Sequence, residues 1–281
     1  MKRPFDFASG TAVVTGAASG IGEQLAFSLA GRGSALALVD RDADRLEAVA
    51  AVAGSVSGRS VTTYVVDLAD NAATKDLGTL LATAHPDTTL LINNAGVALG
   101  GAFHQVSEEE FDWLMSINFR AVVTLTRALL PVLRSNDGSH LVNISSIFGI
   151  IAPPGQVAYA SSKFAVRGFT EALRGELAPA VGVTVVHPGG VRTRIAQTAR
   201  IAAAIPAQQA AQGRDRVARL LTYPPEKAAG LILRAVERRR PRLLIGSTAV
   251  LPDLLARALP AGTPGLLAAL QRLGSRRQRT G

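Results

Sequence analysis

A serine, a tyrosine and a lysine near the middle of the chain have the residue types and spacing of a proton-transfer site. Tyr159 and Lys163 stand four residues apart, so a helix over residues 156–177 would project both from one face, with the ammonium below the phenol. A phenol ionises near pH ~10, and a cation within hydrogen-bonding reach lowers its pKa towards neutrality. We therefore expect Tyr159 to act as acid or base. Ser146 follows the apolar run 141–144, which is typical of a buried strand, and its hydroxyl can hold a substrate oxygen.

A tyrosine and a lysine at this spacing are weak evidence by themselves, because any helix supplies such pairs and most lie on a solvated surface. The glycine-rich turn near the amino end adds context. A β-rich run over residues 11–15 leads into Gly16, Gly20 and Gly22, and a helical segment over residues 23–29 follows. Strand, turn and helix in this order cradle a phosphate at the amino end of the helix. An ordinary glycine-rich turn is the alternative interpretation.

An acidic residue at a suitable distance favours the phosphate-binding interpretation. Asp40 ends the next apolar run and lies 18 residues beyond Gly22, close to where an acceptor for a ribose 2′-hydroxyl is expected. This favours NAD over NADP. Arg41 leaves NADP open, because a guanidinium can bind a 2′-phosphate or stack on adenine. Asp67 ends a later strand and can meet the adenine amino group.

The apolar runs and helical segments alternate along the chain. We predict strands over residues 11–15, 35–39, 61–66, 89–92, 138–144, 183–187 and 242–245. Helices are expected over residues 23–29, 44–53, 71–84, 108–134, 156–177 and 225–238. This alternation predicts a single α/β domain with a doubly wound, mostly parallel seven-stranded sheet and helices on both faces.

The motifs together carry a family resemblance. The glycine turn, the stretch Asn93-Asn94-Ala95-Gly96, the serine strand and the Tyr159/Lys163 pair occur in the order found in the short-chain dehydrogenase/reductase family. The chain resembles that family over about residues 10–195. The resemblance implies a Rossmann-type fold and catalytic roles for Ser146, Tyr159 and Lys163, with Asn118 as the fourth member of a tetrad.

The resemblance also implies a cofactor site, a reaction and an assembly. It implies hydride transfer between a nicotinamide cofactor, NAD with NADP as the alternative, and a secondary alcohol or ketone. Family members usually form dimers or tetramers through the helices that correspond to residues 108–134 and 156–177. The implied cofactor-binding residues are Gly16, Ser19, Gly20, Ile21, Gly22, Asp40, Arg41, Asp67, Leu68, Asn94, Ala95, Gly96, Tyr159, Lys163, Pro188, Gly189, Val191 and Thr193.

The sequence leaves two interpretations of the substrate segment and two of the function. Residues 194–222 are rich in alanine and glutamine and correspond to the family's substrate lid. Their small apolar side chains favour an apolar substrate over a sugar, but a mobile surface helix pair that says nothing about substrate fits equally well. The alternative function is a nucleotide-sensing protein that kept the fold and lost catalysis. Intact Ser146, Tyr159 and Lys163 argue against it, since a sensor needs none of them.

Composition excludes several classes of site. The 281 residues include no cysteine, which excludes disulfides and thiolate metal sites, and the four histidines show no paired ligand spacing, so no metal is expected. No uninterrupted apolar run approaches the roughly 18 residues of a membrane span, and the amino end lacks the apolar core of a signal peptide. We expect a cytoplasmic protein.

The positive charge is concentrated at the carboxyl end. Residues 234–281 hold ten arginines against two carboxylates, a net charge of +8, which leaves +1 of the total of +9 for the rest of the chain. We expect a catalytic domain over residues 1–246 and a helical, basic extension over residues 247–281. No nucleic-acid-binding motif accompanies the arginines, so no nucleic-acid partner is expected. We expect the leucines at 266, 267, 270 and 273 to pack against protein, with contact to an anionic membrane as the alternative.

Overall fold

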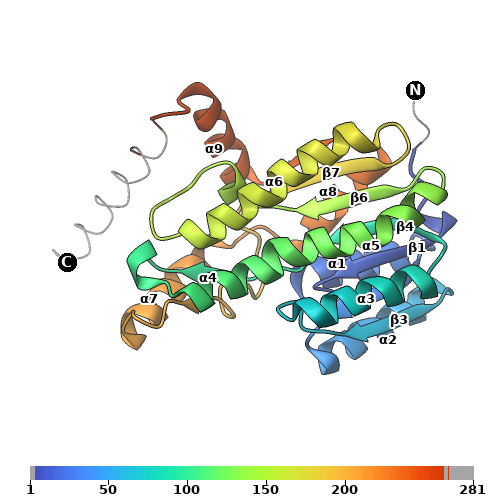
Figure 1. Cartoon of the computed structure of the whole chain (residues 1–281), viewed down its shortest axis with the longest axis horizontal. Helices are drawn as coiled ribbons and strands as arrows, with labels where there is room; N and C mark the ends of the chain where they lie inside the picture. Colours follow the sequence, from blue (N-terminus) through green and yellow to red (C-terminus); the bar gives the residue numbers. More distant parts are fainter. Residues whose placement is uncertain (1–3, 263–264, 266–281) are drawn as a thin grey trace.

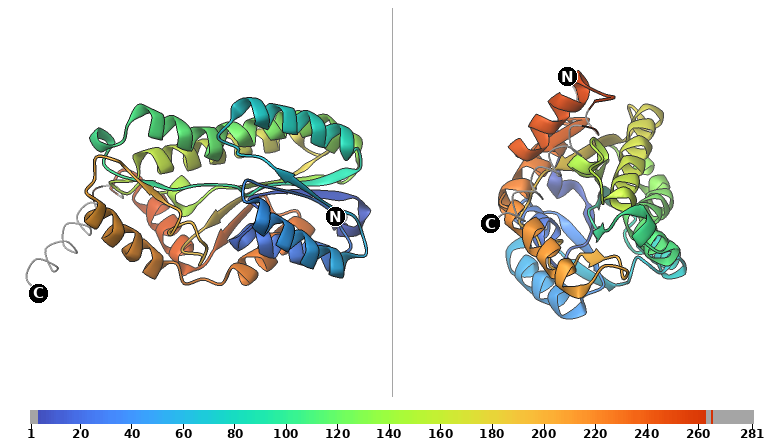
Figure 2. Two further views of the ribbon diagram at one scale, coloured as in Figure 1. Left: turned by 90° about the horizontal axis from the view of Figure 1, so that it is seen from below. Right: turned by 90° about the vertical axis from the view of Figure 1, so that its left-hand side faces the viewer.

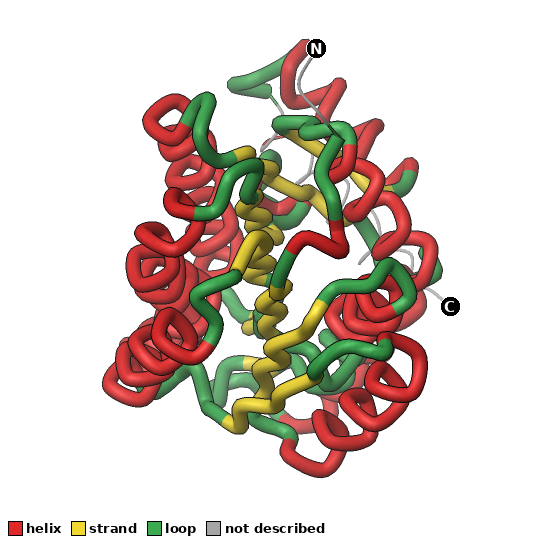
Figure 3. Tube along the Cα trace, turned by 90° about the vertical axis from the view of Figure 1, so that its right-hand side faces the viewer, coloured by secondary structure: helices red, strands yellow, loops and turns green. Residues whose placement is uncertain are grey.

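The protein folds into a twisted sheet between two layers of helices (Figures 1 and 3). The structure is a computed structural model that describes residues 4–262 and Gly265. The large sheet has the strand order β3-β2-β1-β4-β6-β7-β9, and every neighbouring pair in it is parallel. The order reverses direction beside β1, as it does in doubly wound folds that bind nucleotides at that point. The predicted fold is confirmed, and the sheet is entirely rather than mostly parallel.

The elements lie close to the predicted ranges. The strands are β1 (Thr11–Thr15), β2 (Ala35–Asp40), β3 (Val61–Val65), β4 (Thr88–Asn93), β6 (His140–Ile144), β7 (Gly182–Pro188) and β9 (Arg242–Ile245). The short strands β5 (Leu99–Gly100) and β8 (Arg200–Ile201) pair with each other and were not predicted. The α-helices are α1 (Gly20–Ala30), α2 (Ala43–Ser57), α3 (Asn71–Ala84), α4 (Glu108–Met115), α5 (Ala121–Ser135), α6 (Val157–Leu177), α7 (Ala207–Leu220), α8 (Pro225–Glu237) and α9 (Ser247–Ala258).

Each face of the sheet has its own apolar core because successive side chains of a strand point to opposite faces. Val14 and Leu38 face the layer of α1, α2 and α8, whereas Val13 and Val39 face the layer of α3, α5 and α6 (Figure 2). All four are fully buried. Burial on both faces explains why the strands are near-continuous apolar runs without a polar alternation.

The predicted helix over residues 108–134 is interrupted around Asn118. Residues Ser116–Arg120 form a π-turn between α4 and α5, in which the Ala121 amide donates to the Ser116 carbonyl. Asparagine is a poor residue in a helix interior, and π-turns occur frequently at functional sites. The turn lets the Asn118 side chain leave the helix and reach the loop after β4.

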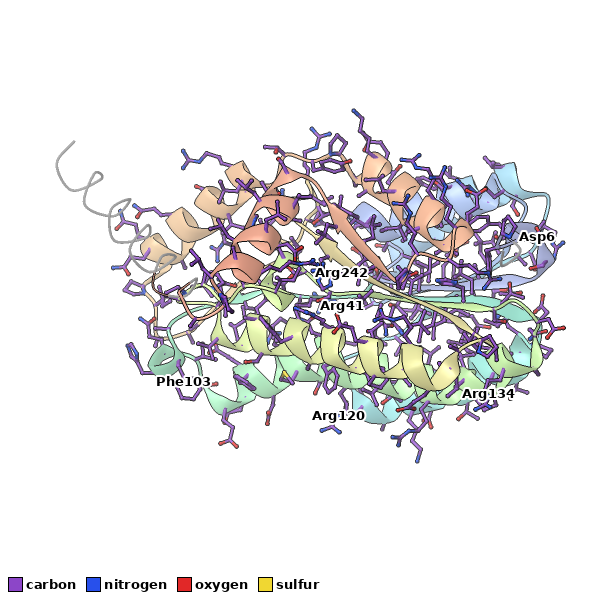
Figure 4. All side chains as sticks on the ribbon, turned by 90° about the horizontal axis from the view of Figure 1, so that it is seen from above. Asp6, Arg41, Phe103, Arg120, Arg134 and Arg242 are labelled. Atoms are coloured by element: carbon purple, nitrogen blue, oxygen red, sulfur yellow. The ribbon has the colours of Figure 1, made fainter. Side chains whose placement is uncertain are left out.

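Within the described part of the chain, one helical stretch, Glu108–Ser135, is long and apolar enough to cross a membrane by length and composition. Its inner side packs in the core, where Leu125, Leu129 and Leu133 are fully buried. Arg120 and Arg134 project from its outer side (Figure 4). This is the packing of a core helix at the surface of a sheet.

The two ends of the described chain pack onto the body. Phe5 and Phe7 are buried, although the sequence analysis gave them no role. At the other end, α9 lies in the expected helical extension and packs against β9 and the loop after Ser146. The expected leucine helix at 266–273 lies outside the described residues.

Candidate functional site

Loops from four strands meet at one edge of the sheet, because parallel strands bring their carboxyl ends together. Gly16 follows β1, Asn94 follows β4, Ser146 follows β6 and Gly189 follows β7. This edge lies at the end of the molecule where α4, α7 and α9 are found (Figure 1). The sequence therefore brings its glycine turn and its serine to the same place.

Ser146, Tyr159 and Lys163 form a buried cluster at this edge. The Ser146 side chain lies near enough to the Tyr159 phenol to influence its pKa, and both residues are less than a tenth exposed. The Ser146 hydroxyl also accepts the Phe148 amide at 3.1 Å, which fixes the start of a short 3-10 turn. Lys163 Nζ donates to the Ile144 carbonyl at 3.0 Å and lies 5.8 Å from the centre of the Tyr159 ring. Helix α6 thus places the tyrosine and the lysine on one face, as their spacing predicted.

The electrostatics of this cluster differ from the sequence-based expectation. Burial raises the pKa of Tyr159, and the hydrogen bond from Ser146 lowers it by less. Burial also lowers the pKa of Lys163 to about 8. The predicted lowering of the Tyr159 pKa towards neutrality is therefore wrong for this arrangement, because desolvation of the phenolate outweighs the stabilising contacts. At neutral pH Tyr159 is a protonated phenol.

Asn118 joins the cluster through the loop after β4. Its Oδ1 accepts the Val97 amide at 2.8 Å, and its Nδ2 donates to the Val97 carbonyl at 3.0 Å and to Ser162 Oγ at 3.1 Å. A Cβ added to Gly96 would lie 3.2 Å from Lys163 Nζ and 3.3 Å from Asn118 Oδ1. The lysine and the asparagine therefore both approach Gly96 closely, and the bonds of Asn118 to Val97 hold the loop in place.

The glycine turn leads into the start of α1, where backbone amides can bind a phosphate. Ser19 precedes α1 without forming a side-chain cap, so no side chain covers the first backbone amides at that position. A Cβ on Gly20 would lie 2.8 Å from Thr193 Cγ2, which shows how closely the loop after β7 approaches. Ser19, Gly20 and Thr193 line a groove of about 600 Å³. These groups fit the pyrophosphate of a dinucleotide.

Three arginines that the sequence analysis did not name line the same groove: Arg45, Arg192 and Arg194. Arg45 and Arg194 each approach the Asp42 carboxylate, at 3.3 Å and 3.9 Å. Glu23 also lines the groove, so the rim carries both signs with an excess of positive charge that suits an anionic ligand. Nothing in their spacing along the chain pointed to this gathering, since they come from α2 and from the loop after β7.

Asp40 has a structural role besides the expected one. Its carboxylate accepts the amides of Ala18 at 3.0 Å, Arg41 at 2.7 Å and Asp42 at 3.1 Å. These bonds tie the end of β2 to the glycine turn. The exposed Arg41 guanidinium lies 3.9 Å from the Asp67 carboxylate, which partly neutralises it.

Thr15 and Asn94 hold the base of the site together. Thr15 Oγ1 accepts the amides of Asn94 and Ala95, both at 3.0 Å. Asn94 Nδ2 donates back to the Thr15 carbonyl at 2.9 Å and to the Gly16 carbonyl at 3.2 Å. Sequence reasoning found Asn94 and Ala95 but missed Thr15, whose hydroxyl at a strand end was the available signal.

The remaining predicted cofactor positions fall into two groups. The side chains of Ile21 and Leu68 are buried in the two cores, so any contact with a cofactor involves their backbone. Pro188 ends β7, and the Val191 amide donates to the Gly189 carbonyl at 3.0 Å. Val191 is also bridged to Tyr223, which holds the loop after β7 against the segment before α8.

The predicted lid segment is held against β5 and α4. Strand β8 pairs with β5, the Arg200 guanidinium lies 3.7 Å from the centre of the Trp113 ring, and Glu110 Oε1 accepts the Ala203 amide at 2.9 Å. The Tyr159 ring shares a cluster with β5 and α4, whose apolar members are Val97, Ala98, Leu99, Val106, Phe111, Trp113, Leu114, Phe148 and Ala158. The surroundings of the tyrosine ring are therefore largely apolar.

A buried histidine is hydrogen-bonded to the backbone of Ser146. His187 Nδ1 lies 3.0 Å from the Ser146 carbonyl, and because a carbonyl only accepts, the nitrogen donates. Burial, as the largest cause, lowers the pKa of His187 to about 4, and Arg242 and Arg167 add to the lowering. The Gly149 amide donates to the same carbonyl at 3.0 Å. The neutral imidazole therefore helps to fix the Ser146 peptide.

We expect His187 to make folding stability depend on pH. The unfolded chain binds a proton at His187 below about pH 6.5, whereas the folded state does so only near pH 4. The contribution of the neutral imidazole to folding stability is therefore complete above pH 6.5 and is lost as the pH falls towards 4. The difference corresponds to about 3 kcal/mol. Urea unfolding over this pH range should show that the free energy of unfolding of His187→Asn depends less steeply on pH than that of the unmodified protein. His104→Asn, at an exposed histidine, should match the unmodified protein. Equal dependences for all three proteins would contradict the assignment.

Comparisons with known proteins agree with this site. The family model described as short chain dehydrogenase matches residues 10–203. SadH of Mycobacterium tuberculosis, an oxidoreductase by its name, is 40% identical over 267 residues, which cover 94% of this chain and 95% of that protein.

Two solved structures share the fold. A short-chain dehydrogenase/reductase from Burkholderia phymatum in complex with NAD superposes with a TM-score of 0.83 at 27% identity, covering 92% of this chain and 97% of that one. A short-chain dehydrogenase from Sphingobium yanoikuyae in complex with NADPH gives a TM-score of 0.72 at 30% identity, covering 89% and 93%. The match over most of the chain and the clustered Ser146, Tyr159 and Lys163 lead to one conclusion: this chain belongs to the short-chain dehydrogenase family of oxidoreductases.

Proposed function

We propose that the protein interconverts an apolar secondary alcohol and its ketone, using NAD and Tyr159 as the acid or base. The observation that carries the proposal is the buried pair of Ser146 and Tyr159, with Lys163 Nζ 5.8 Å from the centre of the tyrosine ring. A sensor of nucleotides would gain nothing from burying three such groups together. The bound nicotinamide supplies or accepts the hydride.

The residues of the candidate site have separate roles in proton transfer and in positioning the substrate. In reduction, protonated Tyr159 donates its proton to the ketone oxygen, and the Ser146 hydroxyl orients that oxygen. The raised pKa of Tyr159 suits this direction at neutral pH, since the phenol holds its proton until the substrate accepts it. The Lys163 ammonium stabilises the phenolate that forms, and Asn118 fixes the neighbouring loop.

The surroundings of Tyr159 support an apolar substrate. Leu99, Leu114 and Ala158 are almost fully buried beside it, and Val106, Phe111 and Phe148 pack against them. A sugar bound against this apolar cluster would leave several hydroxyls without partners, at a cost of about 1–3 kcal/mol each. A ketone with apolar substituents meets no such penalty.

The proposed function is tested by following NADH absorbance during incubation with a panel of ketones. Aliphatic and polycyclic ketones should be reduced, and the corresponding secondary alcohols should be oxidised with NAD. Sugars and polyols should react much more slowly. A protein that binds NADH but turns over no member of the panel, in either direction, would support the sensing alternative.

The cofactor preference has its own test. We expect the unmodified protein to use NADH better than NADPH, because the Asp40 carboxylate accepts hydrogen bonds from a ribose diol but repels a 2′-phosphate. Asp40→Ala should narrow or reverse the ratio of the kcat/KM values for NADH and NADPH, since the repulsion by the Asp40 carboxylate is removed and the exposed Arg41 guanidinium can bind the 2′-phosphate. A large preference of the unmodified protein for NADPH would show that Arg41 dominates.

Asp70→Ala is the matched control for this variant. Asp70 accepts two backbone amides, of Ala72 and Ala73, at the start of α3, much as Asp40 accepts three at the glycine turn. Its loss should cost about 1 kcal/mol of stability and leave the cofactor ratio unchanged. The comparison separates an electrostatic effect on the ribose from a general loosening of backbone contacts.

We extend the proposal to a homo-oligomer, a dimer or tetramer formed through α5 and α6. Val157 and Phe164 are about two-fifths exposed on α6, and Phe119, in the π-turn just before α5, meets Phe169 of α6 edge to face with 6.1 Å between the ring centres. Apolar side chains on two neighbouring helix faces favour contact with a second copy.

A further inference from the structure

Helix α9 exposes a continuous apolar face. The exposed fractions are 41% for Val250, 66% for Leu251, 57% for Leu254, 38% for Leu255 and 51% for Leu259, which follows the helix. At helical spacing these positions lie on one half of the cylinder. Within the described residues 4–262 nothing covers this apolar half-cylinder, and such a patch on a short helix is typical of an interaction site.

The opposite side of α9 is fixed firmly to the protein. Ala249 is fully buried and packs in a cluster with Ile147 and Ile151. The buried Asp253 is bonded through both carboxylate oxygens to Arg242 and pairs with Arg257 at 3.1 Å. The leucines are therefore exposed on a rigidly placed helix that already has its own packing side.

The same helix borders the candidate site. Thr248 Oγ1 accepts the Gly190 amide at 3.0 Å, within the loop that follows β7. Ile147 and Ile151, which pack on α9, flank the turn that begins at Ser146. Figure 1 shows α9 at the end of the molecule where α4 and α7 also lie. Whatever covers the leucine face therefore binds a helix that contacts two loops of the site.

The positive charge of α9 and of the sequence that follows it indicates which kind of partner fits the apolar face. Arg257, 65% exposed by its side chain, stands at the rim of the apolar face. No acidic residue follows Asp253 in the sequence, whereas Arg257, Arg272, Arg276, Arg277 and Arg279 do follow. Two copies that each carry such a basic segment repel one another by charge, which disfavours a second copy as the partner. An anionic lipid surface is complementary to both the leucines and the arginines.

We propose that the exposed face of α9 binds the surface of an anionic membrane. The leucines enter the boundary between headgroups and acyl chains, and the arginines lie among the headgroups. Helix α9, and with it the two loops of the candidate site that contact its other side, then lies at the lipid surface. Binding to the membrane does not depend on the proposed reaction, so turnover plays no part in the test.

The test is co-sedimentation of the full chain with lipid vesicles. Vesicles of equal parts phosphatidylcholine and phosphatidylglycerol should bind the protein at low salt, and added salt should weaken the binding. Vesicles of phosphatidylcholine alone should bind it at least about tenfold more weakly. The double variant Leu251→Gln, Leu254→Gln should bind the anionic vesicles at least about tenfold more weakly than the unmodified protein.

The matched controls are Val56→Gln on α2 and Leu80→Gln on α3, whose side chains are 59% and 51% exposed. Both should bind like the unmodified protein. Because Leu251 is two-thirds exposed, the single variant Leu251→Gln should keep the melting temperature and still lose part of the binding. Absence of binding to either vesicle, or equal binding by the double variant, would overturn the proposal. A lower mass of the double variant in light scattering would assign the face to a contact between copies instead.

Discussion

Tyr159→Phe should lower turnover by about 10³-fold while leaving the Kd for NADH within a few-fold. The substitution removes only the hydroxyl that donates and accepts the proton, and general acid catalysis of this kind contributes about 10²–10⁴-fold. The ring remains and keeps its edge-to-face contact with Phe148 at 6.0 Å and its place in the apolar cluster. The measurements are steady-state kcat and NADH binding by fluorescence.

Tyr64→Phe is the matched control for Tyr159→Phe. The Tyr64 hydroxyl is hydrogen-bonded to His85 Nε2 at 2.7 Å, on a strand at the edge of the sheet. Its loss should cost about 1 kcal/mol of stability and leave kcat within about twofold. If Tyr159→Phe retained more than about a tenth of the turnover, another group would be the proton donor.

Gly22→Ala should damage both the fold and cofactor binding. A Cβ at this position would lie 2.0 Å from the Gly16 carbonyl oxygen and 2.7 Å from Asn94 Nδ2. The nearest atom is backbone, so the glycine turn must move, and such overpacking costs up to about 3 kcal/mol. We expect the melting temperature to fall by roughly 6–12 °C. The Kd for NADH should rise on the order of tenfold or more, since about 1.4 kcal/mol corresponds to a factor of ten.

Gly54→Ala separates this effect from the general consequence of replacing a helical glycine. Gly54 lies in α2 with nothing within 4 Å of an added Cβ. Alanine there should stabilise the protein by about 0.5–1 kcal/mol and leave the Kd for NADH unchanged. Scanning calorimetry and NADH titration measure both quantities. A Gly22→Ala protein as stable as the unmodified one would show that the turn relaxes without cost.

The sequence by itself determined the strands and the meeting of the site loops. A parallel sheet is buried on both faces, so each strand stands out as an apolar run between helical segments. Parallel strands also bring their carboxyl ends to one edge. The positions of Gly16, Asn94, Ser146 and Gly189 along the chain therefore predicted that these residues would gather.

Local spacing also determined two finer features. Tyr159 and Lys163 share a helix, so their relation follows from helical geometry alone. Asn118 was recognisable as a poor interior residue, and the helix does change to a π-turn around it. Both inferences concern residues a few positions apart, where backbone geometry leaves little freedom.

Only the tertiary structure decided the properties that depend on groups distant in sequence. The pKa of Tyr159 is raised by burial among side chains that come from the loop after β4, from α4 and from the turn after Ser146, so no pair of residues predicts it. The bonds of Asp40 to Ala18 and of His187 to Ser146 join separate strands and loops. Whether the leucines of α9 are covered depends equally on the whole fold, since a helical stripe specifies an apolar face but not what lies against it.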